Sequence, residues 1–238
     1  MKLLDILKDL TYGELSGLTI GNLIPDEFDN EPDPHQYEQI VSYINLGLTE
    51  IYKRFFLRSQ EIDVQQHEEI TTYKLHSDYA QSNLASPILI AERYILDTAE
   101  DPFRDDILKI EEVYNEEGTK LAMNDTSDVN SVYTPAYNKV QIPYPNDANI
   151  FSVQYRANHP KIPITLATHP EDVEVEVPNS LYAALLQYVG YRSNLRTNPE
   201  KSADFWNQFK RTCDEVDTYG LEVQSEPGDW RFDEHGWA

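Results

Sequence analysis

The stretch PHQYEQIVSYINLGLTEIYKRFFL, residues 34–57, decides the fold of this chain. Its apolar residues recur with the 3.6-residue period of an amphipathic helix; they are Tyr37, Ile40, Val41, Ile44, Leu48, Ile51, Tyr52 and Phe55. Asp33 can accept a hydrogen bond from a free N–H at the helix start, and Pro34 has no such N–H to satisfy. The pattern predicts one long helix whose apolar side needs a partner.

That partner is expected near the other end of the chain. Asn179 or Ser180 can cap a first helix there, and Asn198-Pro199 repeats the capped start found at Asp33. The apolar stripes are Leu181, Leu185, Tyr188 and Val189 in the first helix, and Phe205, Phe209, Cys213 and Val216 in the second. Neither helix is long enough to be stable alone, so we expect both to pack against residues 34–57.

Between these helical regions the pattern changes to short strands, turns and prolines. Val173, Val175 and Val177 alternate with Glu174 and Glu176, as in a strand that is buried on one face. Other strands are predicted at residues 61–64, 69–75, 107–114, 141–143 and 150–155, with a hairpin turn at 115–118. Residues 77–100 are ambiguous, because Pro87 interrupts them and residues 88–96 fit either a strand or a short helix.

The predicted fold class is therefore α+β. A helical bundle from the N- and C-terminal helices carries an inserted β-rich module and an extended C-terminal arm. The predicted segments are an N-terminal helix and loop (1–33), the bundle (34–60 and 179–220), the β-rich insert (61–178) and the arm (221–238).

Composition limits the function. The 238 residues carry a formal net charge of −23, and such a surface repels phosphate, which disfavours nucleic-acid binding through a basic patch. The same charge suits a channel through which DNA slides. The single cysteine, Cys213, excludes an internal disulfide and fits a reducing cytoplasm. Lys2, Asp5, Lys8 and Asp9 interrupt the first ten residues, so we expect neither a signal peptide nor a membrane span.

Motifs that would carry chemistry are weak. Phosphate-loop, dinucleotide, zinc-protease and nucleophile-elbow patterns do not occur in the sequence. His67 precedes Glu68-Glu69 but has no second histidine at ligand spacing, and residues 125–128 lack the glycine and final glutamate of a calcium loop. The neighbouring carboxylates Asp105-Asp106 and Glu111-Glu112 would point to opposite faces of a strand. We expect no enzymatic activity, no metal and no cofactor.

Aromatic residues instead suggest contacts between proteins. The arm contains Trp230, Arg231, Phe232 and Trp237, and such side chains commonly bury in the surface of a partner. Tyr133, Tyr137 and Tyr144 fall in proline-bearing loop segments, where contact with a neighbouring subunit or simple loop packing would explain them equally well.

Three segments carry a family resemblance. They are PFRDDILKIEEVY (102–114) with the following Glu117-Gly118 and Asn124-Asp125, VYTPAYN (132–138) leading to VQYRANHP (153–160), and Val177-Pro178 before residues 181–190. In this order they resemble the head-to-tail adaptor proteins of short-tailed bacteriophages, also called head-completion or tail tubular proteins. The resemblance covers about residues 33–220.

The resemblance implies a structural virion protein of the neck or tail, made in the host cytoplasm. Its expected partners are the portal protein, a tail nozzle or other tail protein, and further copies of itself in a dodecameric connector ring. DNA would pass through the ring without specific binding during ejection, and Glu174 and Glu176 are the channel-lining candidates. Two alternatives stay open: a tail-associated cell-wall (peptidoglycan) hydrolase, which zymography would detect, and a soluble binding module.

Overall fold

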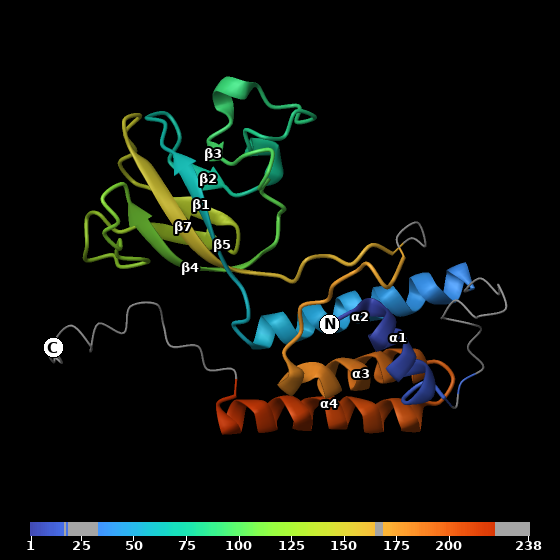
Figure 1. The fold of residues 1–238 in the computed structure, drawn as a ribbon. Helices are drawn as coiled ribbons and strands as arrows, with labels where there is room; N and C mark the ends of the chain where they lie inside the picture. The colour runs from blue at the N-terminus through green and yellow to red at the C-terminus, as the bar shows by residue number, and fades with distance from the viewer. Residues whose placement is uncertain (17, 19–32, 165–168, 222–238) are drawn as a thin grey trace, which may run out of the picture. The chain divides into compact units, whose positions relative to one another are not determined.

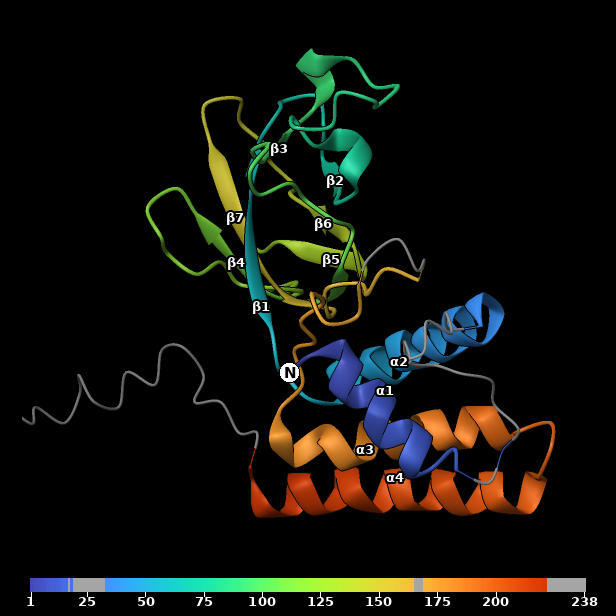
Figure 2. The ribbon, with the colours of Figure 1, turned by 45° about the vertical axis from the view of Figure 1, so that its right-hand side comes forward.

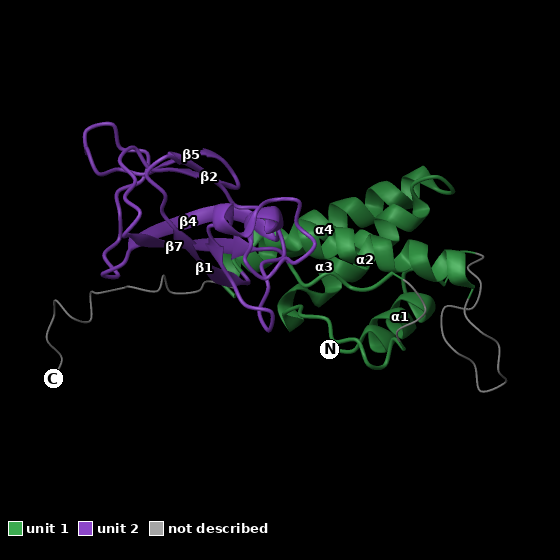
Figure 3. Ribbon diagram, turned by 90° about the horizontal axis from the view of Figure 1, so that it is seen from above, with its two compact units in different colours: residues 1–56, 159–238 green, residues 57–158 purple. Residues whose placement is uncertain are grey.

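The structure of the chain is a computed structural model that describes residues 1–16, 18, 33–164 and 169–221 (Figure 1). The chain folds into two compact units (Figure 3). Residues 1–56 with 159–238 form one unit, here called the helical unit, and residues 57–158 form the other, called the β unit. Helices and antiparallel sheets are therefore segregated, which makes the protein α+β, as predicted.

The described part of the helical unit contains α1 (Leu3–Tyr12), α2 (Pro34–Arg54), α3 (Asn179–Asn194) and α4 (Pro199–Tyr219). Helix α3 lies between α2 and α4, and α1 contacts α3 (Figures 1 and 2). Segments that are far apart in the sequence are thus neighbours in this unit, because each amphipathic helix buries its apolar side against another helix.

The helix ends follow the predicted capping chemistry. The carboxylate of Asp33 accepts a hydrogen bond from the backbone N–H of His35 at 3.1 Å, and Asn198 Oδ1 accepts one from the N–H of Lys201 at 3.1 Å. Gly220 follows α4 with a left-handed φ of 61°, a conformation that glycine adopts without strain. The predicted capping of α3 by Asn179 or Ser180 is wrong, because the N-cap position is occupied by Pro178.

Apolar side chains from all four described helices form the core of the helical unit. Its buried residues include Leu3, Ile6, Leu7 and Leu10 of α1, Ile40, Val41, Ile44, Leu48 and Ile51 of α2, Leu181, Leu185 and Val189 of α3, and Phe209, Cys213 and Val216 of α4. Arg54 also ties the end of α2 to α4, donating from Nε to Asp217 at 2.8 Å and from Nη2 to Asp214 at 2.7 Å.

The valine-glutamate alternation at 173–177 does not form the predicted strand. Val175 is buried and Glu174 is exposed, so the alternation of burial is real, yet the backbone pairs only at one isolated bridge between Lys2 and Glu174. Its hydrogen bonds join it to the start of the chain, from Leu3 N to Val173 O at 2.9 Å and from Val175 N to Met1 O at 2.8 Å. Residues 1–3 are too short a partner for a continued ladder of strand hydrogen bonds.

The β unit contains two antiparallel sheets. The strands are β1 (Ser59–Gln65), β2 (Thr72–Lys74), β3 (Ile95–Leu96), β4 (Ile107–Asn115), β5 (Tyr133–Ala136), β6 (Lys139–Gln141) and β7 (Ile150–Ala157). Their orders are β3-β1-β7-β4 and β2-β6-β5. Two short 3₁₀ helices, η1 (Ser77–Tyr79) and η2 (Ile90–Glu92), lie between β2 and β3. Residues 88–96 thus contain both a helical turn and a strand, which explains their ambiguous pattern.

Buried side chains from both sheets form one core in the β unit. The ring of Tyr73 on β2 packs edge-on against Phe151 on β7 and against Tyr94, with both centroid separations at 5.2 Å. The predicted turn after β4 is present: Gly118 has a φ of 76°, and Leu121 N donates to Val113 O at 2.8 Å as the chain returns.

The β unit is shorter than the predicted insert. It begins at residue 57 and ends at 158, whereas the prediction runs from 61 to 178. Residues 159–164 and 169–178 belong to the helical unit because their hydrogen bonds go there. Asn45 of α2, for example, donates from Nδ2 to Ile162 O at 3.0 Å and accepts from Ile162 N at 2.9 Å.

Candidate interaction surfaces

Two of the three candidate interface tyrosines are well exposed in the β unit. Tyr137 lies in the tight turn between β5 and β6 and is 65% exposed, and Tyr144 lies between β6 and β7 and is 75% exposed. Tyr133 differs, because it starts strand β5, is half-buried and donates its hydroxyl hydrogen bond to Asp125 O at 3.3 Å. Its predicted position in a loop is therefore wrong, and packing within the unit accounts for part of its surface.

The two candidate channel residues lie before α3 in the helical unit, and both have exposed side chains. Lys2 donates from Nζ to Glu174 Oε1 at 3.1 Å, and this hydrogen bond and the ammonium charge lower the pKa of Glu174 below its usual value. The carbonyl of Glu176 accepts a hydrogen bond from the hydroxyl of Tyr52 on α2 at 2.9 Å. The backbone here is fixed by α2 and by the chain start, while the Glu176 carboxylate faces solvent.

The arm residues Trp230, Arg231, Phe232 and Trp237 lie outside the described residues. The third tryptophan, Trp206, is half-buried on α4 within an aromatic group shared with α3. Its ring stacks on Phe209 with a centroid separation of 5.4 Å and contacts Tyr191 of α3 at 5.1 Å. This group stabilises the α3–α4 pair and leaves part of the indole exposed.

A hollow of about 440 Å³ in the β unit is lined by several carboxylates beside β1. Most of them have structural partners. Asp97 accepts from the backbone N–H groups of Ser82 at 2.8 Å and Phe103 at 2.9 Å, and Asp106 accepts from the hydroxyl of Tyr155 at 3.0 Å. Burial and the Asp106 carboxylate raise the pKa of Tyr155, which therefore stays protonated as the donor. These contacts hold loops to the sheet.

The structure also gives structural roles to other candidate side chains, namely carboxylates and the cysteine. Glu111 pairs with Arg156 at 3.1 Å, and Glu112 pairs with Lys120 at 2.6 Å. Asp125 accepts hydrogen bonds from Ser127 N at 2.8 Å and Ser127 Oγ at 2.6 Å, which lower its pKa. Burial raises the pKa of the Cys213 thiol to about 11, as suits a core residue.

The described residues contain no group of three or more His, Cys, Asp and Glu side chains placed to hold a metal ion. None of the helices in that part of the chain combines the length and the apolar character needed to cross a bilayer.

Sequence reasoning missed one exposed apolar group. Leu84, Leu89 and Ile90 lie between β2 and β3 and project into solvent. The signal available in the sequence is the apolar run around Pro87, which is too short for a buried helix and too irregular for a strand. An apolar run that fits neither element is a reasonable candidate for an exposed contact surface.

Comparison with known proteins supplies the family. A search of curated proteins finds no match. The model of the SU10 adaptor protein family matches residues 10–229, which contain the β unit and most of the helical unit. Proteins of this family are structural components of the phage neck that associate with other neck and tail components. The resemblance drawn from the sequence motifs is confirmed, and the chain belongs to the SU10 adaptor protein family, a family of phage head-to-tail adaptors.

Proposed function

We propose that this chain is a non-enzymatic subunit of a ring that joins the portal to the tail nozzle and leaves a central channel for DNA. The observation that carries the proposal is the family match over residues 10–229. A ring subunit acts by geometry, so its requirements are a rigid body, surfaces for its neighbours and a channel wall that does not retain DNA.

The helical unit fits the role of the rigid body. Its core includes side chains that are completely buried on α1, α2 and α3, among them Leu3, Ile44 and Leu185. Close packing of this kind resists deformation. We assign the ring wall to the described helices α1 to α4 as a bundle, and contacts with neighbouring chains to the β unit through Tyr137 and Tyr144.

Charge supports the proposed passage of DNA. Counterion release at Lys and Arg contacts provides most non-specific DNA affinity, and a chain with a net charge of −23 has a large excess of carboxylates. We assign Glu174 and Glu176 to the channel wall, because both are exposed and their backbone is held by hydrogen bonds. Carboxylates there would repel the phosphates and let the duplex slide.

The arm is proposed to fix the ring to an adjacent chain or to the portal. This assignment rests on its sequence, in which Trp230, Phe232 and Trp237 supply apolar surface and Arg231 supplies a charge-assisted hydrogen bond donor. Buried tryptophans commonly dominate the energy of an interface.

Reconstitution with the portal tests the function. The purified chain is mixed with portal rings, and the product is examined by native mass spectrometry and cryo-electron microscopy. We expect a closed ring of about twelve copies on one end of the portal, in keeping with the cyclic symmetry of such assemblies. Failure to bind the portal, or location of the chain outside the neck of purified particles, would refute the proposal.

A further inference from the structure

An exposed apolar loop of the β unit carries a further inference. Leu84, Leu89 and Ile90 are 89%, 68% and 71% exposed. Single exposed apolar residues are common, but three large ones within residues 84–90 keep a substantial apolar area in water over a short segment. We call this segment the 84–90 loop.

The loop is held in place by a buried arginine. The guanidinium of Arg93 donates from Nη1 to Asn83 O at 2.6 Å, and from Nε and Nη2 to Ile88 O at 3.0 and 2.9 Å. These carbonyls precede Leu84 and Leu89 directly, so one side chain fixes the backbone at both apolar residues. A rigid presentation of this kind lowers the entropy lost on binding.

Further hydrogen bonds join the loop to η1. Asn83 donates from Nδ2 to Ser77 O at 3.0 Å, and Ser86 donates from Oγ to Asp78 O at 2.6 Å. The exposed side chains therefore stand on a loop that hydrogen bonds hold to η1 and to Arg93. Their exposure is a fixed property of the surface.

An acidic hollow of about 270 Å³ adjoins the loop. Glu68, Glu69, Glu92 and Asp147 line it, and its described lining residues include no Lys or Arg. Helix η2 supplies Ile90 to the apolar loop and Glu92 to the hollow, so the two features share one element.

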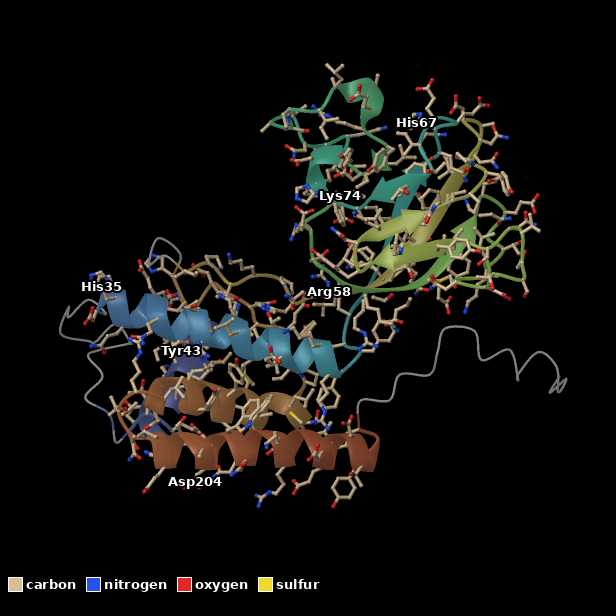
Figure 4. The ribbon with its side chains drawn as sticks, turned by 180° about the vertical axis from the view of Figure 1, so that it is seen from behind. His35, Tyr43, Arg58, His67, Lys74 and Asp204 are labelled. Carbon is tan, nitrogen blue, oxygen red and sulfur yellow. The ribbon has the colours of Figure 1, made fainter. Side chains whose placement is uncertain are left out.

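His67, which Figure 4 labels in the β unit, also lines this hollow. Its Nε2 atom is buried and has no hydrogen-bond partner among the described residues. Because that atom is shielded from solvent, the chemistry open to a ligand in the hollow is set by the carboxylates. Carboxylates attract cations and accept hydrogen bonds, so the hollow suits a positively charged group with N–H donors.

We propose that the 84–90 loop and the acidic hollow form one docking surface for a segment of another protein, in which apolar side chains stand beside a Lys or Arg. The apolar side chains would cover Leu84, Leu89 and Ile90, and the cation would enter the hollow. The carboxylates of the hollow favour a cationic segment, and the contacts between copies of this chain are assigned to Tyr137 and Tyr144, so this surface is left for a different protein. The inference rests on the proposed function in one respect, which is that the partner is another virion protein.

Peptide selection on the purified full-length chain tests the chemistry directly. A random dodecapeptide display library is selected on the wild-type protein, and enriched peptides are synthesised and titrated by fluorescence anisotropy. We expect sequences with Lys or Arg beside apolar residues. Their affinity should fall about tenfold or more in L84S/L89S/I90S, and about tenfold in E68Q/E69Q/E92Q.

V129S is the matched control, because Val129 is an exposed aliphatic residue of the same unit, 71% exposed and far in sequence from the loop. Circular dichroism confirms folding of each variant, which is expected since every altered side chain is exposed. Equal affinity in wild type and both multiple variants, no enriched sequence, enrichment of acidic peptides, or peptides that copy this chain would each overturn the proposal. Absence of the chain from virions would refute the neck function and leave these measurements intact.

Discussion

Replacing Gly47 by alanine tests how closely α2 and α3 approach. Gly47 lies within α2, where alanine favours the helix by about 1 kcal/mol. A Cβ atom at this position would lie 2.9 Å from Cδ1 of Leu185 and 3.0 Å from Cδ1 of Tyr188 on α3. Both side chains are buried and cannot turn away into solvent. Overpacking costs about 1–3 kcal/mol, so we expect G47A to lower the stability of the helical unit by up to about 2 kcal/mol.

The effect of G47A on the free energy of unfolding should change sign when a second substitution makes room for the added methyl group. L185A alone should cost about 2–5 kcal/mol, because it leaves a cavity between the helices. In that background the added methyl group enters the space left by the leucine, and only the contact with Tyr188 opposes the gain in helix propensity. We therefore expect a coupling of about 1–3 kcal/mol between the two positions. E38A is the control, because Glu38 is an exposed residue of α2.

Urea unfolding followed by circular dichroism at 222 nm provides the free energies, since the helical unit contains the α-helices of the described residues. A change of 1 kcal/mol corresponds to a shift of roughly 2–4 °C in Tm for a chain of this size. The reasoning fails if G47A stabilises the wild-type protein, or if the effects of G47A and L185A simply add.

Three further predictions concern assembly and charge. Y137S/Y144S should leave the Tm unchanged but prevent closed rings on the portal, as native mass spectrometry would detect; normal rings would exclude these tyrosines from the interface. Deletion of residues 221–238 should abolish portal capture in a pull-down while the monomer stays folded, and unchanged capture would remove the arm from the interface. Burial and the nearby Asp9 raise the pKa of Glu14 above 4.5. Stability is therefore lost as pH rises through that pKa, so E14Q should raise the Tm at pH 7 and lose its advantage below pH 4.5.

The helical part of the fold could be predicted because periodicity and capping agree there. The starts of α2 and α4 are fixed by an Asx cap followed by proline, and their ends come within a few residues of the expected positions. Phe55 already leaves the helix, although the apolar pattern continues to residue 57. An apolar side chain after a helix can be buried as well as one within it, so periodicity alone cannot locate the last turn.

Residues 173–177 show where local pattern is insufficient. Alternation predicts which side chains are buried, and Val175 is buried as expected. A strand also needs a neighbouring backbone over several residues, and the available neighbour ends where α1 begins at Leu3. That neighbour lies at the other end of the sequence, so no local signal reveals its length.

The candidate surfaces depend even more on distant contacts. The sequence marks Tyr137 and Tyr144 only as a residue type, whereas the exposure of Tyr137 follows from the pairing of β5 with β6, which places it in the turn. The 84–90 loop was missed because its shape depends on Arg93, whose side chain folds back onto carbonyls that precede it in the chain. From the sequence alone such an arginine is only a positive charge. Its role in fixing the loop becomes visible when the structure shows it buried and hydrogen-bonded to backbone carbonyls.

The β unit is inserted into the helical unit in a way that limits the cost of the insertion. Strands β1 and β7 pair from Ser59 and Arg156 onward, and Ala157 N donates to Arg58 O at 3.0 Å where the chain enters and leaves the unit. The two ends of the inserted segment are therefore held side by side by its own sheet. The helical unit therefore meets the insert as if it were a short loop between α2 and the segment before α3. A long flexible loop at this place would cost more chain entropy on folding. Surfaces such as the 84–90 loop can then change in sequence without disturbing the helix packing, because no residue of that loop belongs to the helical core.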